Sequence, residues 1–370
     1  MNYSYWEYKE WFSKNDFVIV GSGIVGLNCA IHLKNRFPKA TILILERGLL
    51  PQGASTKTAG FACFGSVSEL VSDLKIHSEE EVFNLIEKRW KGLQLLRNIL
   101  GDHRIDYQHH YGYELFLDHY LFEECNDKIH SLNRLLSPVF KKNVFSTTAN
   151  IFDFQKIVPK YILNHFEGQI DPGKMMVQLL RLSQQKGIKI LHNVTVEKFS
   201  ESADKVTLQT NHGAFITSRL LLATNGFSKE LISENIEPAR AQVLITKPIK
   251  DLHIKGAFHL DEGYYYFRNI NNRILLGGGR NLDFLEEETT EFGQTKVVQD
   301  KLEKILRTII FPNTTFEIER RWSGIMGVGN KKKPIVKQIS NNVYCGIRLG
   351  GMGVSIGSLV GAELANLVDF

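Results

Sequence analysis

Three closely spaced glycines follow an apolar run near the start of the chain. The run Phe17–Val20 leads into Gly21-Ser22-Gly23-Ile24-Val25-Gly26, and Glu46 closes a second apolar run twenty residues further on. Gly21 permits a tight turn out of a strand, Gly23 lets a pyrophosphate approach the backbone, and Gly26 lets the following helix pack closely. The amino end of that helix offers N–H donors and a positive dipole, and Glu46 offers an acceptor for a ribose hydroxyl. The pattern predicts a site for NAD or FAD; a glycine turn made only for packing is the alternative.

Side chains suited to holding a small molecule occur much later in the chain. On an extended strand Tyr264, Tyr266 and Arg268 share one face, which would form a substrate wall. Arg348 follows an apolar run and precedes a glycine-rich turn. A guanidinium binds a carboxylate through two parallel hydrogen bonds, so Arg348 is the first candidate for a carboxylate contact and Arg268 the second. A tyrosine packing face and a surface ion pair of Arg348 are the competing interpretations.

The composition is typical of a globular protein with about two domains. The 370 residues are 43% hydrophobic and 23% charged, which suits full cores. The net charge of +5 is dispersed, and the densest basic run, Lys331-Lys332-Lys333, lacks interleaved aromatic residues. We therefore expect no nucleic-acid partner.

Neither the cysteines nor the histidines have the spacing of a metal site. Cys29, Cys63, Cys125 and Cys345 are scattered, and the histidines at positions 103, 109 and 110 have no supporting cysteine or paired carboxylates. We expect no metal and no disulfide framework.

The chain shows no targeting or membrane-spanning segment. Met1–Lys14 is aromatic and charged, unlike a secretion signal, and no apolar run reaches the length of a transmembrane helix. These features predict a cytoplasmic protein and leave a peripheral membrane association open.

Alternating helix and strand patterns divide the chain into segments. Asp171-Pro172-Gly173 begins a helix that Gly187 ends, strand patterns follow up to Ala223, and the last segment pairs a strand at Val343 with a helix of small residues. Two insertions separate these segments, and the second contains the alternating pattern of an antiparallel sheet. Gly277-Gly278-Gly279 in that insertion would bend a strand or contact a cofactor.

Taken in order, six short motifs resemble the FAD-dependent D-amino-acid oxidase superfamily, in its glycine oxidase and sarcosine oxidase-like branch. The resemblance covers nearly the whole chain. Besides VIVGSGIVGL with LER at 45–47, the motifs are GASTKTAGF at 53–61, IDPGKMM at 170–176, LLATNG at 221–226, RWSGIMG at 321–327 and LGGMGVSIG from 349.

This resemblance implies an α/β fold with a discontinuous FAD domain. Residues 1–75, 166–239 and 323–370 would form a Rossmann-like FAD-binding domain. Residues 76–165 and 240–322 would form an inserted α+β substrate domain built on an antiparallel sheet. The residues implied to contact FAD are Gly21, Ser22, Gly23, Ile24, Val25, Gly26, Glu46, Arg47, Ser55, Thr56, Lys57, Thr58, Ala59, Gly60, Val196, Ala223, Thr224, Asn225, Gly226, Gly350, Gly351, Met352, Gly353, Val354 and Ser355.

The implied activity is oxidation of an amino acid or related amine, with hydride passing from the substrate carbon to flavin N5. Lys57 would stabilise negative charge on the reduced flavin, and FAD would be non-covalent because relatives attach it near the position of Gly324 rather than Cys345. Met326 stands where D-amino-acid oxidases carry a carboxylate-binding arginine, and Leu275 where sarcosine oxidases have an oxygen-activating lysine. The electron acceptor is therefore oxygen or a quinone-type carrier. Oxidation of a 2-hydroxy acid and a redox-inactive flavin-binding regulatory role are the alternatives.

Overall fold

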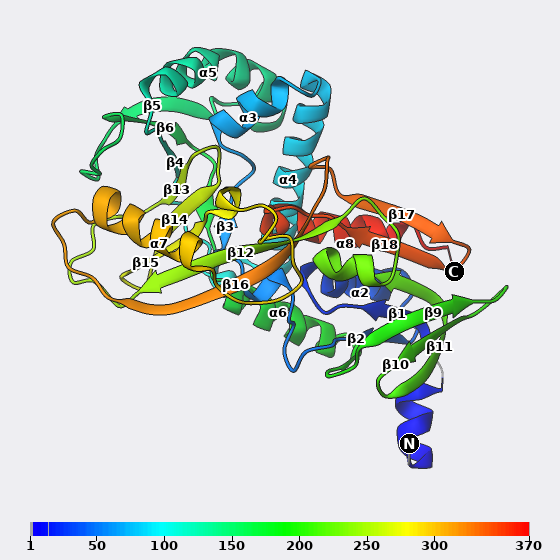
Figure 1. The fold of residues 1–370 in the computed structure, drawn as a ribbon. Coiled ribbons are helices and arrows are strands. Elements are labelled where there is room, and N and C mark those ends of the chain that lie inside the picture. Colours follow the sequence, from blue (N-terminus) through cyan, green and yellow to red (C-terminus); the bar gives the residue numbers. More distant parts are fainter. Residues whose placement is uncertain (1–2, 14, 370) are drawn as a thin grey trace.

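The computed structural model describes residues 3–13 and 15–369, and among these residues the strands form two large sheets. The first sheet lies beside the carboxyl terminus in Figure 1. Its path runs β17 (Ile335–Ser340), β18 (Val343–Ile347), β11 (Gly213–Leu222), β1 (Asn15–Val20), β2 (Ile42–Leu45), β8 (Lys189–Leu191), with β10 (Val206–Thr210) on β11 and β9 (Val196–Glu201) on β10. Strands β11, β1, β2 and β8 pair in parallel, so their carboxyl ends meet at one edge.

Helices cover this sheet because β1 and β2 are apolar on both faces, as parallel strands between helical layers are. Helix α2 (Ile24–Arg36) packs against α8 (Gly353–Asn366), and α6 (Pro172–Gln185) and α4 (Glu79–Leu100) join them. The small residues of α8 permit the close approach, since a Cβ on Gly361 would lie 2.7 Å from the carbonyl oxygen of Val25.

The second sheet stands beside the first and is almost entirely antiparallel (Figure 1). Its order is β16 (Ile318–Val328), β12 (Glu237–Thr246), β15 (Arg273–Gly278), β14 (Tyr265–Ile270), β13 (Ala257–Leu260), β4 (Gly112–Leu115), β6 (Lys160–Asn164), β5 (Phe145–Ala149). Only β4 and β13 pair in parallel, and this pair joins the two inserted parts of the chain. Helix α7 (Lys296–Ile305) packs on one face through Val298 and Leu302.

Smaller elements connect the two sheets. Helices α3 (Val67–Leu74) and α5 (His119–Phe140) cover the far end of the second sheet (Figure 1). The two-stranded sheet of β3 (Phe61–Ala62) and β7 (Gly168–Gln169) lies between the large sheets.

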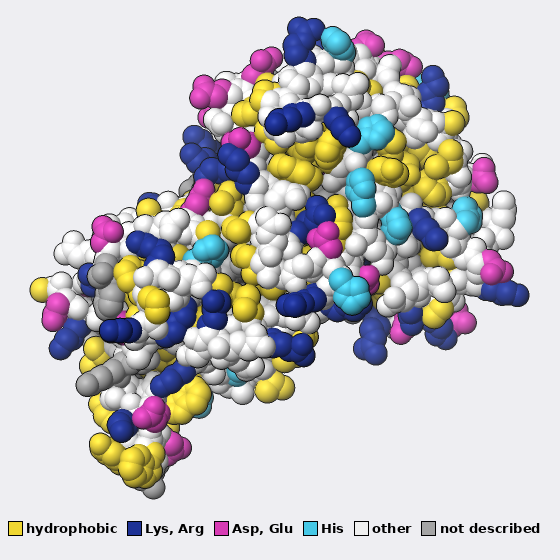
Figure 2. Space-filling model, turned by 180° about the vertical axis from the view of Figure 1, so that it is seen from behind, with side chains coloured by type: hydrophobic (Ala, Val, Ile, Leu, Met, Phe, Trp, Pro, Cys, Tyr) yellow, Lys and Arg dark blue, Asp and Glu magenta, His cyan; other side chains and the backbone are white. Residues whose placement is uncertain are grey.

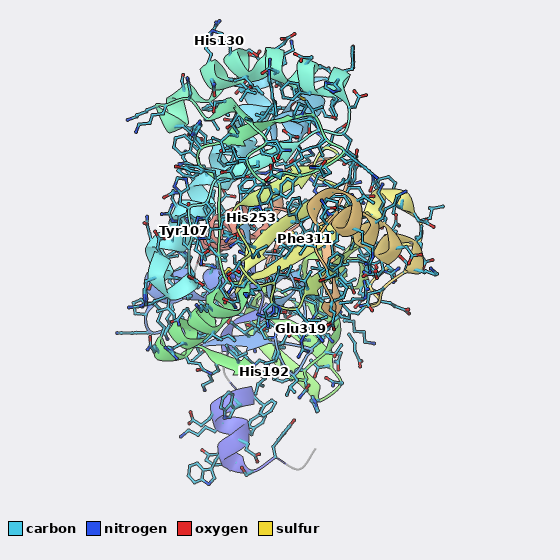
Figure 3. The ribbon with its side chains drawn as sticks, turned by 90° about the vertical axis from the view of Figure 1, so that its left-hand side faces the viewer. Tyr107, His130, His192, His253, Phe311 and Glu319 are labelled. Atoms are coloured by element: carbon cyan, nitrogen blue, oxygen red, sulfur yellow. The ribbon has the colours of Figure 1, made fainter. Side chains whose placement is uncertain are left out.

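A short amino-terminal helical segment projects from the first sheet. It consists of α1 (Tyr5–Glu7) and a π-helical turn at Tyr8–Phe12, and its residues include no buried side chain. Phe12 contacts Phe215 of β11, and the outer side chains, among them Tyr5 and Trp6, are exposed. Figure 2 shows hydrophobic side chains gathered at this tip, and Figure 3 shows the helix standing clear of the body below His192.

The expected elements and fold class are confirmed. The predicted helix after Gly23 is α2, Asp171 caps α6, and the mixed α/β architecture matches the expectation. The domain boundaries stay a prediction, and β16 continues in the second sheet to Val328, past the expected limit at 322. None of the helices in the described ranges is both long and apolar enough to cross a membrane.

Candidate active site

A cavity of about 580 Å³ opens where the carboxyl ends of the parallel strands meet the second sheet. Val20, Leu45 and Ala223, which end or follow strands β1, β2 and β11, line one part of it. Tyr264 and Tyr266 line another part. Ligands of open α/β sheets bind at this edge, outside the carboxyl ends of the strands.

The glycine-rich turn lines the cavity in the manner its spacing predicts. Gly21 has φ +102°, a conformation that favours glycine, and a Cβ there would lie 2.8 Å from the Ala223 carbonyl oxygen. A Cβ on Gly26 would lie 1.9 Å from the Gly21 carbonyl oxygen, so the helix packs directly on the turn. Gly23 caps α2 without a side chain of its own, so apart from the Ile24 N–H, which donates to Ser55, the amino end of the helix is left for an anion.

Glu46 lines the cavity with its carboxylate fixed from both sides. One oxygen accepts from the backbone N–H of Ser22 (3.0 Å) and from its hydroxyl (2.7 Å). The other oxygen accepts from the N–H groups of Gly48 (3.0 Å) and Gln52 (3.3 Å). The carboxylate is thus preorganised at the end of β2, where the ribose contact is predicted.

Two polar side chains hold the loops around this cradle together. Ser55 accepts a hydrogen bond from Ile24 N–H (2.9 Å), which ties the GASTKTAGF segment to the start of α2. Asn225 accepts from the N–H groups of Arg348 (3.1 Å) and Leu349 (3.2 Å). The LLATNG motif therefore fixes the turn that leads into α8.

On the second sheet, one face carries a row of residues of which His259 and Tyr266 line the cavity. The registers place Glu114, His259, Tyr266 and Gly277 opposite one another on neighbouring strands, and so on one face. A Cβ on Gly277 would lie 2.6 Å from a ring carbon of Tyr266. Gly277 therefore makes room for the Tyr266 ring, which favours the packing interpretation of that glycine.

Phe61, the last residue of the GASTKTAGF segment, continues the wall formed by Tyr264 and Tyr266. The Phe61 ring meets Tyr266 edge-on at 5.5 Å and His259 at 5.3 Å between centroids. Burial raises the pKa of Tyr266 to about 12, so its hydroxyl stays protonated and available as a donor. The wall is aromatic with few charges, as ligand sites commonly are.

His259 forms a buried pair with Glu167 that the sequence did not single out. Its Nε2 lies 2.8 Å from a Glu167 carboxylate oxygen. Burial alone would lower the pKa of His259, but the charge and hydrogen bond of Glu167, with Glu114 and Glu69 nearby, raise it above its usual value. The pair thus holds an imidazolium in the cavity wall at higher pH than an isolated histidine would.

Cys63 lies beside this pair. The donor atoms of Cys63, Glu167 and His259 are all within 4.8 Å of one another, a set of types that binds metals. Burial and the neighbouring carboxylates raise the pKa of the Cys63 thiol well above its usual value, which favours the protonated thiol over a ligand. The expectation of no metal stays a prediction.

Arg348 lines the cavity, but its guanidinium is bonded to the protein. Nε and one terminal nitrogen donate to the Lys333 carbonyl (3.0 and 2.9 Å), and the other donates to the carbonyl and side-chain oxygens of Asn235 (2.8 and 3.1 Å). Arg348 also has φ +63°, which is uncommon for a non-glycine residue. These contacts join the Arg348 side chain to the backbone at Lys333 and Asn235. A substrate carboxylate could form the predicted contact only by displacing them.

Arg268 shares the face of Tyr266, as predicted, yet it does not reach the cavity. It is 2% exposed and lies further along that face of β14, where burial lowers the pKa of its guanidinium to about 10 despite the charges of Asp171 and Asp106. Strand β14 runs past the cavity, so alternation alone could not tell which of its residues reach the opening.

Lys57 lies in the cavity wall near Gly324. Its carbonyl accepts from the Trp322 indole N–H (2.8 Å), and its ammonium lies 5.3 Å from the Phe292 ring centroid. A Cβ on Gly324 would approach the Lys57 side chain to 3.0 Å. The predicted role at the flavin stays a prediction.

Most of the residues expected at FAD line this one cavity. They are Gly21, Gly23, Ile24, Val25, Glu46, Arg47, Ser55, Lys57, Thr58, Ala59, Val196, Ala223, Thr224, Asn225, Gly350, Gly351, Met352, Gly353 and Val354. The others do not line it: Ser22, Gly26, Thr56, Gly60, Gly226 and Ser355. Among these six, the Thr56 hydroxyl donates to the Pro51 carbonyl within its own loop.

Charged residues that were not among the predicted site residues line a further part of the cavity. Lys332 pairs with Glu69 (3.0 Å) and Asp73 (2.8 Å), and Arg89 lies 3.6 Å from Glu69. Arg280 also lines the cavity. The only sequence signal for Arg280 was its place directly after the three glycines, and the ion pairs join segments too distant for a spacing pattern to reveal.

A comparison with protein families gives a match over nearly the whole chain. Residues 16–367 match the model of DAO, described as FAD dependent oxidoreductase. The chain belongs to this family. The resemblance inferred from the motifs is therefore confirmed, and the protein is an FAD-dependent oxidoreductase.

Individual relatives of this oxidoreductase are distant. The probable oxidoreductase OrdL of Haemophilus influenzae is 20% identical over 377 aligned positions, covering 95% of this chain and 82% of that protein. The L-proline dehydrogenase from P. horikoshii has a TM-score of 0.77 at 18% identity, covering 96% and 93% of the two chains. The glycine oxidase from Geobacillus kaustophilus has a TM-score of 0.78 at 15% identity, covering 96% and 94%. At these identities the structures establish a shared fold.

The residues of the cavity fit FAD. The glycine turn is a cradle that added Cβ atoms would distort, the N-cap residue Gly23 has no side chain to cover the adjoining helix end, and a fixed carboxylate lies at the end of β2. The same cavity continues to the aromatic wall of the second sheet, which leaves a place for substrate beside the cofactor.

Proposed function

We propose that this oxidoreductase oxidises the CH–NH bond of an amino acid or related amine. The observation that carries the proposal is the single cavity that joins the phosphate cradle at Gly21–Val25 to the aromatic wall of Phe61, Tyr264 and Tyr266. Proline dehydrogenase and glycine oxidase, whose names describe amine oxidation, share the fold around such a site.

The cofactor supplies the acceptor for hydride leaving the substrate carbon. The chain's own residues position the reacting groups. Phe61 and Tyr266 exclude water from one side of the substrate and Tyr264 bounds it on another. The substrate nitrogen must be neutral when the hydride leaves, because a protonated nitrogen has no lone pair to stabilise the forming iminium.

We further infer that the electron acceptor is a quinone-type carrier. By the motif resemblance, Leu275 stands where sarcosine oxidases carry an oxygen-activating lysine, and it is buried against Ala59 and Val243. No cation from that position reaches the cavity, so this route to oxygen activation is absent at Leu275.

Anaerobic mixing with panels of amino acids, simple amines and 2-hydroxy acids tests the function. We expect an amino acid or amine to bleach the flavin absorbance, and readmitted oxygen to restore it more slowly than an added quinone does. Bleaching by hydroxy acids alone would overturn the amine proposal. Rapid reoxidation of the flavin by oxygen would overturn the inference that the electron acceptor is a quinone-type carrier.

A further inference from the structure

Arg280 lines the cavity, and its guanidinium has no hydrogen-bonding partner among the described residues. It begins a short 3-10 turn (Arg280–Leu282) directly after Gly278 (φ +119°) and Gly279 (φ +83°). The Gly279 N–H donates to the Tyr264 carbonyl (3.0 Å), which places Arg280 next to the end of the tyrosine wall.

The other guanidinium groups of the cavity wall are already engaged. Arg47 donates to Gln52 (3.1 Å), Arg89 to the Phe64 carbonyl (2.7 Å), and Arg348 to Asn235 and Lys333. Arg280 has only an aromatic contact, with its guanidinium carbon 4.9 Å from the Phe284 ring centroid. Within the described part of the chain, Arg89 keeps a buried Nε without a partner, but its charge is already matched by Glu69 at 3.6 Å. Among the arginines of the described wall, Arg280 is the one that donates no hydrogen bond and has no carboxylate within ion-pair distance.

The surroundings of Arg280 favour an incoming anion. The guanidinium is partly buried, and burial lowers its pKa below the usual value although Tyr264 and Glu287 act in the opposite direction. Glu287 is not its direct partner: the Glu287 carboxylate accepts from Arg240 (2.8 Å), Gln242 (2.7 Å) and Thr295 (3.1 Å) instead. A carboxylate ligand would supply the missing charge and two parallel hydrogen bonds.

Two lysines of the wall also lack a hydrogen-bonding partner in the described ranges, but they suit this task less well. Lys331 is exposed, and the Lys57 ammonium lies 5.3 Å from the Phe292 ring centroid, with its side chain beside Gly324 of β16. An ammonium is a point charge and cannot form the bidentate pair. Arg280 therefore combines the best geometry with proximity to Tyr264.

We propose that Arg280 binds the carboxylate of the substrate, and that the substrates are accordingly amines that carry a carboxylate. This inference rests on the proposed amine oxidation and assigns the carboxylate contact to a residue other than Arg348 or Arg268. It also explains how a carboxylate could be bound although Met326, on β16, stands where D-amino-acid oxidases carry an arginine. Here the guanidinium would come from Arg280, which follows β15.

Binding of simple carboxylates tests Arg280 without any turnover. The FAD-loaded protein is titrated with acetate and benzoate, and the dissociation constant is read from the change in flavin absorbance and from calorimetry. We expect Arg280→Met to weaken the tighter-binding carboxylate at least tenfold and Arg280→Lys to lie in between. Arg273→Met is the matched control, because Arg273 pairs with Glu319 (2.7 Å) outside the cavity and its loss should leave the affinity unchanged.

Kinetics separate the inference from the function on which it rests. With an active amino acid, Arg280→Met should raise KM at least tenfold and leave KM for an amine without a carboxylate unchanged. Equal carboxylate affinity in Arg280→Met and the parent protein, at equal FAD content and Tm, would overturn the inference. So would the failure of the parent protein to bind either carboxylate. Failure of every amine to reduce the flavin would instead overturn the proposed function, while the titrations still decide on Arg280.

Discussion

The buried pair of His259 and Glu167 makes the cavity wall sensitive to pH. Because the pKa of His259 is raised in the folded protein, the stabilisation from this pair is fully present below the pKa of histidine in the unfolded chain, about 6.5. It is lost as the pH rises through the higher pKa of the folded state. This pH dependence of stability is the reverse of that for a carboxylate whose pKa is lowered, because the stabilisation from such a carboxylate is lost as the pH falls.

Glu167→Gln tests this direction. It keeps the shape of the side chain and removes the charge that holds the imidazolium. We expect the variant to have a lower Tm than the parent protein at pH 6 and a much smaller deficit at pH 9. Glu317→Gln, in the exposed pair with Lys247, serves as the control and should show little effect at either pH. A deficit of equal size at both pH values would rule out the charge effect.

Arg348 shows how a residue can lie in a site and act on the structure around it. Its four hydrogen bonds join the loop before β17 and the stretch before β12 to the turn that leads into α8. We expect Arg348→Met to lower the free energy of unfolding by about 2 kcal/mol, since buried acceptors lose a charged donor. Denaturant titration measures this loss. An unchanged unfolding midpoint would leave the guanidinium free to bind substrate after all.

At the scale of elements, the contact between the glycine turn and α2 decides whether the cradle exists. Gly26→Ala places a methyl group against the Gly21 carbonyl, which is backbone and cannot move aside without opening the turn. We expect the FAD content of the purified variant to fall and the dissociation constant for FAD to rise at least tenfold. Gly173→Ala, at the start of α6, meets only the Asp171 side chain and should retain FAD. Full FAD occupancy in Gly26→Ala would contradict the proposed packing.

A feature could be predicted from the sequence when the residues that make it lie close together along the chain. The cradle spans Gly21–Gly26, so its spacing alone predicts the turn, and burial of β2 at Ile42–Leu45 follows from an unbroken apolar run. Alternation placed Tyr264, Tyr266 and Arg268 on one face, but the point at which β14 leaves the cavity depends on neighbouring strands. The His259–Glu167 pair joins residues 92 positions apart, and no local pattern indicates it.

At the scale of the whole molecule, the cofactor would bridge parts of the chain that are far apart in sequence. The cavity is lined from the starts of α2 and α8, from the end of β2 and from the second sheet. A ligand that binds only the folded protein raises its stability by about 2.7 kcal/mol at a concentration one hundred times its dissociation constant. Removing FAD should therefore lower Tm, and readdition should restore it.

Differential scanning calorimetry of the FAD-loaded and FAD-depleted protein measures this change. We expect the Tm of the FAD-depleted protein to be lower by roughly 3 °C or more. Both sheets should lose stability, because the cavity lies between them. Hydrogen exchange gives the spatial control: protection should fall at β14 and at the start of α2 together. Loss confined to the first sheet would show that the cofactor does not couple the two parts.

The tryptophans give this protein a built-in optical reporter. Trp322 donates its indole N–H to the Lys57 carbonyl at the cavity wall, whereas Trp6 stands 68% exposed on the projecting amino-terminal helix. Indole emission from Trp322 would pass to a flavin bound nearby, while the solvated indole of Trp6 would continue to emit at longer wavelengths. Filling of the cavity should thus appear as selective quenching of the blue part of the emission, a signal available without any substrate.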